Sequence, residues 1–186
     1  MLSSLARFHR HPDEKSLDYE EGRAVYFHRT AEGGTFVCHT LFGTNAYVLS
    51  TSLRTDSELQ DKFGSSYIRI NETTRFAVAV SNHIPGLLAG FEGACHYVSN
   101  RSIEAEGPPI EVSKVFKADG APDTDGLQKL IAANVQERSC FMKNRRFAVE
   151  SEYRLIWLTS KPLQELLILK VPEAIQFCAR PGSLVE

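Results

Sequence analysis

The stretch that decides the fold runs from residue 147 to residue 158 and reads Phe-Ala-Val-Glu-Ser-Glu-Tyr-Arg-Leu-Ile-Trp-Leu. Its residues first alternate between apolar and polar and then become continuously apolar, which is typical of a β-strand that enters a core. Residues two apart on a strand project from the same face, so this strand would hold the carboxylates of Glu150 and Glu152 side by side. Arg154 has the same parity and can balance their charge. The sequence therefore predicts a strand that carries paired carboxylates.

A structural interpretation of these charges stays open from the sequence alone. On the outer face of an edge strand, Glu150, Glu152 and Arg154 would form a ladder of solvated charges, and surface ion pairs contribute little stability. Two neighbouring buried anions are tolerable only at an exposed end of the sheet, or where a cation or polar ligand offsets their charge. The burial of these side chains decides between the two interpretations.

Outward from this stretch, apolar runs and turn signals predict a domain rich in strands. The other predicted strands span residues 23–29, 35–38, 46–52, 67–70, 94–98, 166–171 and 175–179. Residues 56–63 predict a short helix ended by Gly64, and residues 124–138 a longer amphipathic helix. Residues 76–80 fit a strand or a helix equally. Many strands with few helices and no regular βαβ alternation favour the α+β class.

Length and composition predict one domain. The chain has 186 residues, of which 42% are apolar and 24% charged, enough to bury a substantial core. Residues 1–22 are polar and charged and predict a loosely held N-terminal arm or short helix, so the domain proper is expected to span residues 23–186. The formal net charge of −2 gives no overall attraction to nucleic acid or anionic lipid.

The sequence also predicts a cytoplasmic protein without a membrane partner. Its first residues lack the apolar run of a signal peptide, and no stretch approaches the roughly 20 apolar residues that cross a bilayer. The four cysteines, Cys38, Cys95, Cys140 and Cys178, are far apart and have no histidine at ligand spacing. We expect buried free thiols and no metal.

Three consecutive hydroxyls end the predicted strand 46–52. Ser50, Thr51 and Ser52 can simply bond the following turn or cap the next helix. They can also hold a ligand and a catalytic carboxylate in register. A short basic cluster at residues 143–146, just before the carboxylates, predicts solvated surface or a contact to phosphates.

Together these windows resemble a known enzyme family. Tyr-Val-Leu-Ser-Thr-Ser at residues 47–52, Phe63-Gly64, and Glu-Ser-Glu-Tyr-Arg-Leu-Ile-Trp-Leu at residues 150–158 resemble elements of the arginine-serine-glutamate class of ADP-ribosyltransferases. The C-terminal pattern, with Lys143 before it, is also similar to a widespread bacterial domain family without assigned function that carries Glu-x-Glu-Tyr-Arg. The two resemblances are compatible.

The resemblance implies a split β-sandwich with a few flanking helices that clamps NAD. It implies Glu152 as the catalytic carboxylate and Glu150 as the group that activates the acceptor. Ser50 would position the nicotinamide ribose, with Thr51 and Ser52 in support.

The class also uses an arginine from an early strand to contact NAD. Arg29, which closes the predicted strand 23–29 before a glycine turn, is the first choice for this role, and Arg23 is its competitor. The sequence leaves the two open.

The implied function is NAD-dependent ADP-ribosyl transfer by a toxin, effector or phage-conflict protein. NAD would be a substrate, the acceptor a protein or nucleic acid, and a neutralising protein a further partner. Two alternatives remain: an NAD glycohydrolase that uses the same cleft with water as the acceptor, and a non-catalytic domain that binds a nucleotide or protein.

Overall fold

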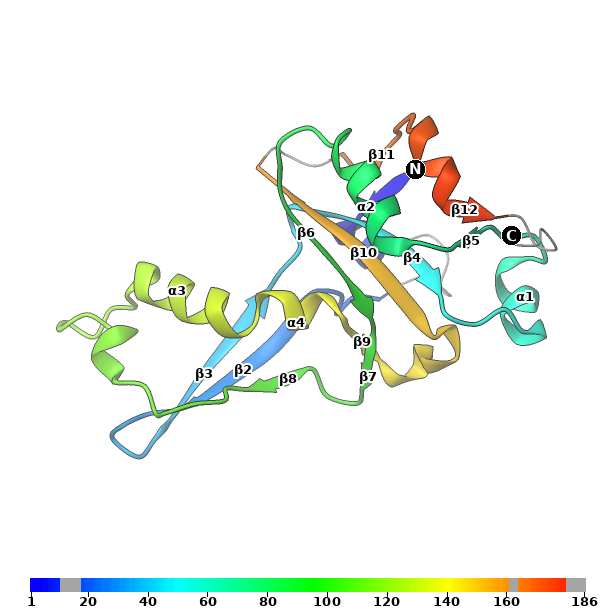
Figure 1. The fold of residues 1–186 in the computed structure, drawn as a ribbon. Coiled ribbons are helices and arrows are strands. Elements are labelled where there is room, and N and C mark those ends of the chain that lie inside the picture. The colour runs from blue at the N-terminus through cyan, green and yellow to red at the C-terminus, as the bar shows by residue number, and fades with distance from the viewer. Residues whose placement is uncertain (11–17, 161–163, 180–186) are drawn as a thin grey trace.

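The computed structural model describes residues 1–10, 18–160 and 164–179 (Figure 1). Its main feature is a sheet of five antiparallel strands among these residues, in the order β11-β1-β4-β10-β6, which we call the central sheet. The strands are β1 (Leu2–Ser4), β4 (Ala46–Ser52), β6 (Leu87–Ala94), β10 (Glu152–Thr159) and β11 (Leu166–Leu167).

β10 is buried on both faces, which explains its continuous apolar run. Leu155 and Trp157 face a core formed with the helix α2 (Thr73–Ser81) and the 3₁₀ helix η4 (Pro172–Phe177). Ile156 faces the other side, where it packs in a second core with Leu5. The indole Nε1 of Trp157 donates to the Ser81 hydroxyl at 2.9 Å, so α2 is tied to the middle of the sheet.

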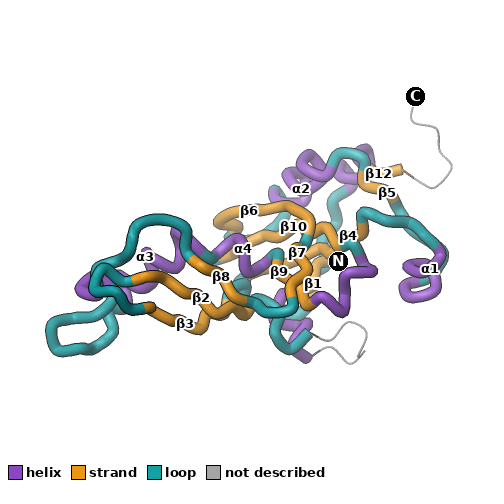
Figure 2. The backbone as a smooth tube through the Cα atoms, turned by 90° about the horizontal axis from the view of Figure 1, so that it is seen from below, coloured by secondary structure: helices purple, strands orange, loops and turns teal. Residues whose placement is uncertain are grey.

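A second sheet extends away from the first, as both views show (Figures 1 and 2). Within the described residues it contains β3 (Thr35–Leu41), β2 (Arg23–Arg29) and β8 (Ser102–Glu104), in that order. One face packs on helix α3 (Thr124–Asn134): Tyr26 and Ile103 are buried there with Val135, which follows the helix. The opposite face of this sheet is open.

Short elements complete the described structure and join the two sheets. Two small strand pairs are β5 (Arg69–Ile70) with β12 (Cys178–Ala179), and β7 (His96–Val98) with β9 (Met142–Asn144). The remaining helices are α1 (Ser57–Phe63), α4 (Gln136–Cys140) and the 3₁₀ helices η1 (Leu5–Arg10), η2 (Val112–Lys114) and η3 (Arg145–Glu150). Among the described helices, none is both long and apolar enough to span a bilayer.

Several predictions from the sequence are confirmed. The strands 23–29 and 46–52 have the predicted bounds, and the α+β class agrees with sheets and helices that do not alternate regularly. Helix α1 begins after Asp56, whose carboxylate accepts from the Leu59 backbone N–H, and it ends at Gly64. Gly64 has φ +102°, a conformation that favours glycine.

Of the two alternatives predicted for residues 1–22, the short helix is confirmed by η1, and the loosely held arm is wrong for the described residues. β1 lies between β4 and β11 in the central sheet, and Leu2 and Leu5 are buried. Glu21 is buried as well, at 1% exposure. These few buried residues stand among polar neighbours, so no local hydrophobic pattern indicated their burial. Residues 11–17 of the predicted arm lie outside the described part.

Residues 76–80, which fitted a strand or a helix, belong to helix α2. Other elements differ from the prediction, and β6 at Leu87–Ala94 was not predicted. Most of the predicted strand 175–179 is the 3₁₀ helix η4, and the long predicted helix breaks at Val135 into α3 and α4. β10 begins only at Glu152, so the first residues of the predicted strand 147–158 fold differently.

Candidate active site

The hydroxyl triplet and the two glutamates line one cleft of about 400 Å³. β4 and β10 pair so that Ser52 lies opposite Glu152 and Ser50 opposite Arg154. Directly opposed residues project from the same face of a sheet, so these side chains share one side. The cleft is lined by Phe8, Ser50, Thr51, Ser52, Phe63, Lys143, Glu150 and Glu152. The predicted proximity of the two motifs is therefore confirmed.

Glu150 reaches the cleft by a route that the sequence did not predict. It ends the 3₁₀ helix η3, and Ser151 has left-handed backbone angles of φ 45° and ψ 49°. The two carboxylates thus do not stand two residues apart on one strand. The Ser52 hydroxyl donates to the Glu150 carbonyl at 2.7 Å, and the Leu53 N–H donates to the Ser151 carbonyl at 2.9 Å. The end of β4 therefore fixes this kink.

Lys143 bridges the two carboxylates. Its Nζ lies 2.5 Å from Glu150 Oε2 and also donates to Glu152 Oε2. The other oxygen of Glu150 accepts from Lys62 Nζ at 2.6 Å. β9 places Lys143 by pairing it with Tyr97 on β7, and the Tyr97 hydroxyl accepts from the Glu152 backbone N–H at 2.6 Å. The bridge is thus built by β7, β9 and β10 together.

Arg154 also binds Glu152. Its Nε donates to Glu152 Oε1 at 2.7 Å, while Nη1 and Nη2 bind the two oxygens of Glu21 at 2.7 and 2.8 Å. Nη1 also donates to the Cys140 carbonyl at 2.6 Å. Both Arg154 and Glu21 have side chains that are 1% exposed. A bidentate arginine–carboxylate pair is the strong and directional form of this contact.

The six side chains, all in the described part, form a network with balanced charge. Three carboxylates (−3) meet three cations (+3), which gives a net charge of zero. The members are Glu21, Glu150, Glu152, Lys62, Lys143 and Arg154. The solvated ladder is excluded, because Glu150, Glu152 and Arg154 are buried at 8%, 3% and 1% exposure.

The network keeps Glu152 ionised. Burial opposes the charge and would raise the pKa of Glu152, but Arg154 and Lys143 outweigh burial and lower this pKa to about 2. Burial likewise opposes the charge of Lys143, yet Glu152 and Glu150 raise the pKa of this lysine above its usual range. The thiol of Cys95 lies nearby, and burial raises its pKa to about 12. Cys95 is therefore a neutral thiol and not a nucleophile at neutral pH.

The structure does not bring the predicted NAD-binding arginine to this cleft. Arg29 is exposed at the end of β2, in the second sheet, where it pairs with Thr35. Arg23 opens the same strand and lines a different groove. Neither arginine is among the residues that line the cleft, because β2 lies away from the end of β4 and the start of β10 (Figure 1). The cation that lines the cleft is Lys143, and it pairs with Glu150 and Glu152.

The predicted basic cluster at residues 143–146 does not form one solvated patch. Lys143 points inward to the carboxylates, and Asn144 accepts from the Arg146 backbone N–H and so begins η3. The guanidinium of Arg146 lies 4.5 Å from the centroid of the Phe147 ring.

Three residues of the site were missed from the sequence: Phe8 lines the cleft, and Lys62 and Glu21 pair with its charged groups. Phe63, which the sequence singled out together with Gly64 but without a role, also lines the cleft. Lys62 and Phe63 directly precede Gly64, so the predicted helix end was the available signal for them. Glu21 lies in a polar segment that gave no signal.

The described residues contain no group of three or more His, Cys, Asp or Glu side chains that could hold a metal ion. Comparisons of this chain with models of protein families, with curated proteins and with solved structures found no match.

Proposed function

We propose that this chain transfers ADP-ribose from NAD to a macromolecular acceptor, with Glu152 as the catalytic carboxylate. One observation carries the proposal: a buried, ionised Glu152 lies opposite Ser52 in a cleft that also contains Glu150 and Ser50. A fixed anion of this kind favours a reaction in which positive charge develops beside it.

The chemistry follows from that charge. The bond between ribose C1′ and the nicotinamide nitrogen breaks, and its electron pair leaves with neutral nicotinamide. The positive charge that develops on the ribose is stabilised by Glu152. A nucleophile of the acceptor then bonds to C1′, and its proton passes to Glu150, which Lys62 and Lys143 hold at the cleft.

The three hydroxyls have separate roles in this proposal. Within the described residues the Ser50 hydroxyl has no hydrogen-bond partner, so it is available to a ribose. Ser52 donates to the Glu150 carbonyl and thereby positions the kink that carries Glu150. Thr51 donates to the Tyr153 carbonyl at 2.9 Å and supports the strand pair. Arg29 has no role in the proposed site.

The proposal extends to fold and setting. The central and second sheets would correspond to the two halves of the split β-sandwich of ADP-ribosyltransferases. The protein would act in the cytoplasm as a toxin, effector or phage-conflict enzyme, with a protein or nucleic acid as its acceptor and a partner protein that neutralises it.

Incubation with NAD labelled in its ADP-ribose part and a cell lysate tests the proposal. Protein, nucleic acid and free ADP-ribose are then separated. Label on a macromolecule supports the transferase, whereas free ADP-ribose alone identifies a glycohydrolase. Intact NAD at all enzyme concentrations would contradict both activities and leave a binding domain.

Substitution of the two glutamates separates their roles. Glu152→Gln keeps the size of the side chain but removes its charge, so we expect NAD turnover to fall by about 100-fold or more with little change in NAD affinity. Glu150→Gln is expected to suppress transfer while sparing NAD hydrolysis. Glu106→Gln is a suitable control, because Glu106 has a side chain that is 90% exposed. Normal NAD turnover in Glu152→Gln would contradict the assignment.

A further inference from the structure

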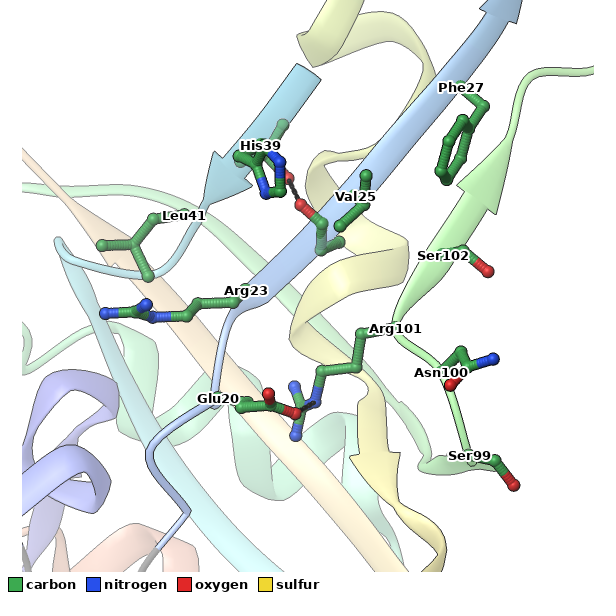
Figure 3. Close-up of a pocket in the computed structure, with 12 residues that line it drawn as sticks. Glu20, Arg23, Val25, Phe27, His39, Leu41, Ser99, Asn100, Arg101 and Ser102 are labelled. Carbon is green, nitrogen blue, oxygen red and sulfur yellow. Dashed lines mark hydrogen bonds and ion pairs between the residues drawn. The ribbon is translucent and has the colours of Figure 1, made fainter. Parts of the chain in front are cut away.

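One face of the second sheet forms a groove of about 870 Å³ (Figure 3). Strand β2 supplies its floor, β3 one wall and the segment 99–102 the other. It is lined by Glu20, Arg23, Ala24, Val25, Phe27, His39, Thr40, Leu41, Ser99, Asn100, Arg101 and Ser102. Among the described residues, none lines both this groove and the cleft.

The alternation of β2 explains why this face is open. Ala24 and Tyr26 point to the core under α3 and are buried. Arg23, Val25 and Phe27 have the opposite parity and face the groove. Val25 and Phe27 are half-buried, so they offer an apolar floor to a ligand. A groove of this volume lies within the range of small-molecule sites.

Arg101 has unused donors beside this groove. Its side chain is only 7% exposed, and Nη2 donates to Asp18 Oδ2 at 2.6 Å. Nε and Nη1 are buried and have no hydrogen-bond partner in the described part of the chain. Buried donors are nearly always satisfied, so two nitrogens of one guanidinium without a partner indicate a missing acceptor.

The charges around Arg101 indicate what that acceptor is. Glu20 Oε2 lies 3.9 Å from Arg101 Nε, too far for a hydrogen bond, and its side chain is 64% exposed, so it can move aside. Arg23 is exposed, and no carboxylate of the described residues pairs with it. Its guanidinium points away from that of Arg101 in Figure 3, so this exposed side chain would turn to reach a phosphate at Arg101. Figure 3 shows Ser99, Asn100 and Ser102 along the same side of the groove as Arg101. Two arginines with hydroxyl and amide groups favour a phosphate.

We propose that this groove binds a nucleotide, with its phosphate at Arg101 and Arg23 and its base against the side chains of Phe27 and Val25. Phosphate oxygens would supply the acceptors that Arg101 lacks and would displace Glu20. A half-buried aromatic ring is a suitable surface on which a base can stack. Nucleotide binding in this groove does not depend on the proposed transferase activity.

Calorimetric titration of the full chain with adenosine 5′-monophosphate tests the proposal, with adenosine and inorganic phosphate as separate ligands. We expect the monophosphate to bind at least about tenfold more tightly than adenosine, a ratio that corresponds to about 1.4 kcal/mol. Arg23→Gln and Arg101→Gln are each expected to weaken its binding by about tenfold or more. Arg29→Gln is the matched control, because Arg29 is an exposed arginine of the same strand outside the groove.

One variant is expected to gain affinity. Glu20→Gln removes the carboxylate that competes with the phosphate, so the monophosphate is expected to bind several-fold more tightly, a result that loss of folding cannot imitate. The proposal is overturned if the monophosphate does not bind, if adenosine binds equally well, or if Arg23→Gln binds as the unaltered chain does. Arg23 is exposed, so this last variant remains decisive if Arg101→Gln fails to fold.

Discussion

Lys143 is the residue on which both carboxylates of the cleft depend. It lies between Glu150 and Glu152, and its side chain is only 12% exposed. Without its charge, two buried anions would repel each other across a region of low dielectric. Lys62 binds Glu150 from the solvent side and is 22% exposed. The two lysines thus differ in burial and in the number of carboxylates they hold.

We expect Lys143→Met to lower the free energy of unfolding by about 3–5 kcal/mol, the usual cost of removing one partner from a buried ion pair. Lys62→Met is the matched control and is expected to cost roughly 1 kcal/mol, because Glu150 keeps Lys143 and the site is more exposed. Urea unfolding of both variants measures the difference. Equal losses in the two would show that Lys143 is not the centre of the network.

The lowered pKa of Glu152 predicts a stability that depends on pH. The pKa falls from 4.5 to about 2 on folding, so this carboxylate contributes stability that is fully present above pH 4.5 and is lost as pH falls toward 2. We expect Glu152→Gln to flatten the decline in the free energy of unfolding over that window. The exposed Glu106→Gln serves as the control, and an unchanged slope in Glu152→Gln would count against the ionised state of Glu152.

At the residue scale, the sequence predicted the convergence at the cleft but not the partners that hold it. Ser52 and Glu152 were predictable because strong strand patterns carried both. Their ionic partners were not, since Lys62 and Glu150 are 88 residues apart and Glu21 and Arg154 are 133 residues apart. A contact at such separation depends on how whole elements pack, which no local pattern encodes.

At the scale of elements, the junction between η3 and β10 depends on the backbone conformation of Ser151. Its φ of 45° lies in the left-handed region, which costs a residue with a side chain roughly 1 kcal/mol and a β-branched one more. The turn allows Glu150 to leave the strand and still reach Lys143. A strand that continued straight through Ser151 would not produce this cleft.

Two substitutions at Ser151 are expected to act in opposite directions. Ser151→Gly relieves the strain, but glycine also raises the conformational entropy of the unfolded chain. We therefore expect the free energy of unfolding to stay unchanged or to rise by up to about 1 kcal/mol. Ser151→Val is expected to lower it by about 1–2 kcal/mol. Thermal and urea unfolding measure both. Equal stability of the two variants would contradict a strained left-handed turn.

The sequence missed β6 for a physical reason. β6 contains Gly90 and Gly93, and glycine is depleted in strands. In the structure a Cβ at Gly90 would lie 3.6 Å from the Trp157 ring, and one at Gly93 would lie 3.5 Å from Phe141. Large neighbours therefore fill the space that glycine leaves. Tertiary packing, which local propensity does not include, makes β6 a strand.

For the whole molecule, the N-terminal segment is part of the central sheet. Leu5 is 1% exposed and packs against the same core as Ile156, and β1 joins β4 to β11. A segment in this position contributes to the stability of the entire sheet. Its buried side chains are few, which explains why composition alone predicted a loosely held arm or a short helix and not a strand of the sheet.

We expect Leu5→Ala to lower the free energy of unfolding by about 2–5 kcal/mol, the range for a large-to-small change in a core. Leu53→Ala, at a side chain that is 63% exposed, is the control and is expected to change stability by less than about 0.5 kcal/mol. Circular dichroism during urea unfolding measures both. A Leu5→Ala protein as stable as the control would mean that the segment is not part of the folded core.

Trp157 gives the central sheet its own optical signal. It is the sole tryptophan of the chain, it is 1% exposed, and its indole binds Ser81 on α2. Intrinsic fluorescence therefore reports on one place, where β10 meets α2. We expect emission at short wavelength from the folded chain and a red shift once water reaches the indole, so the emission wavelength follows the opening of the central sheet by itself, whatever happens in the second sheet.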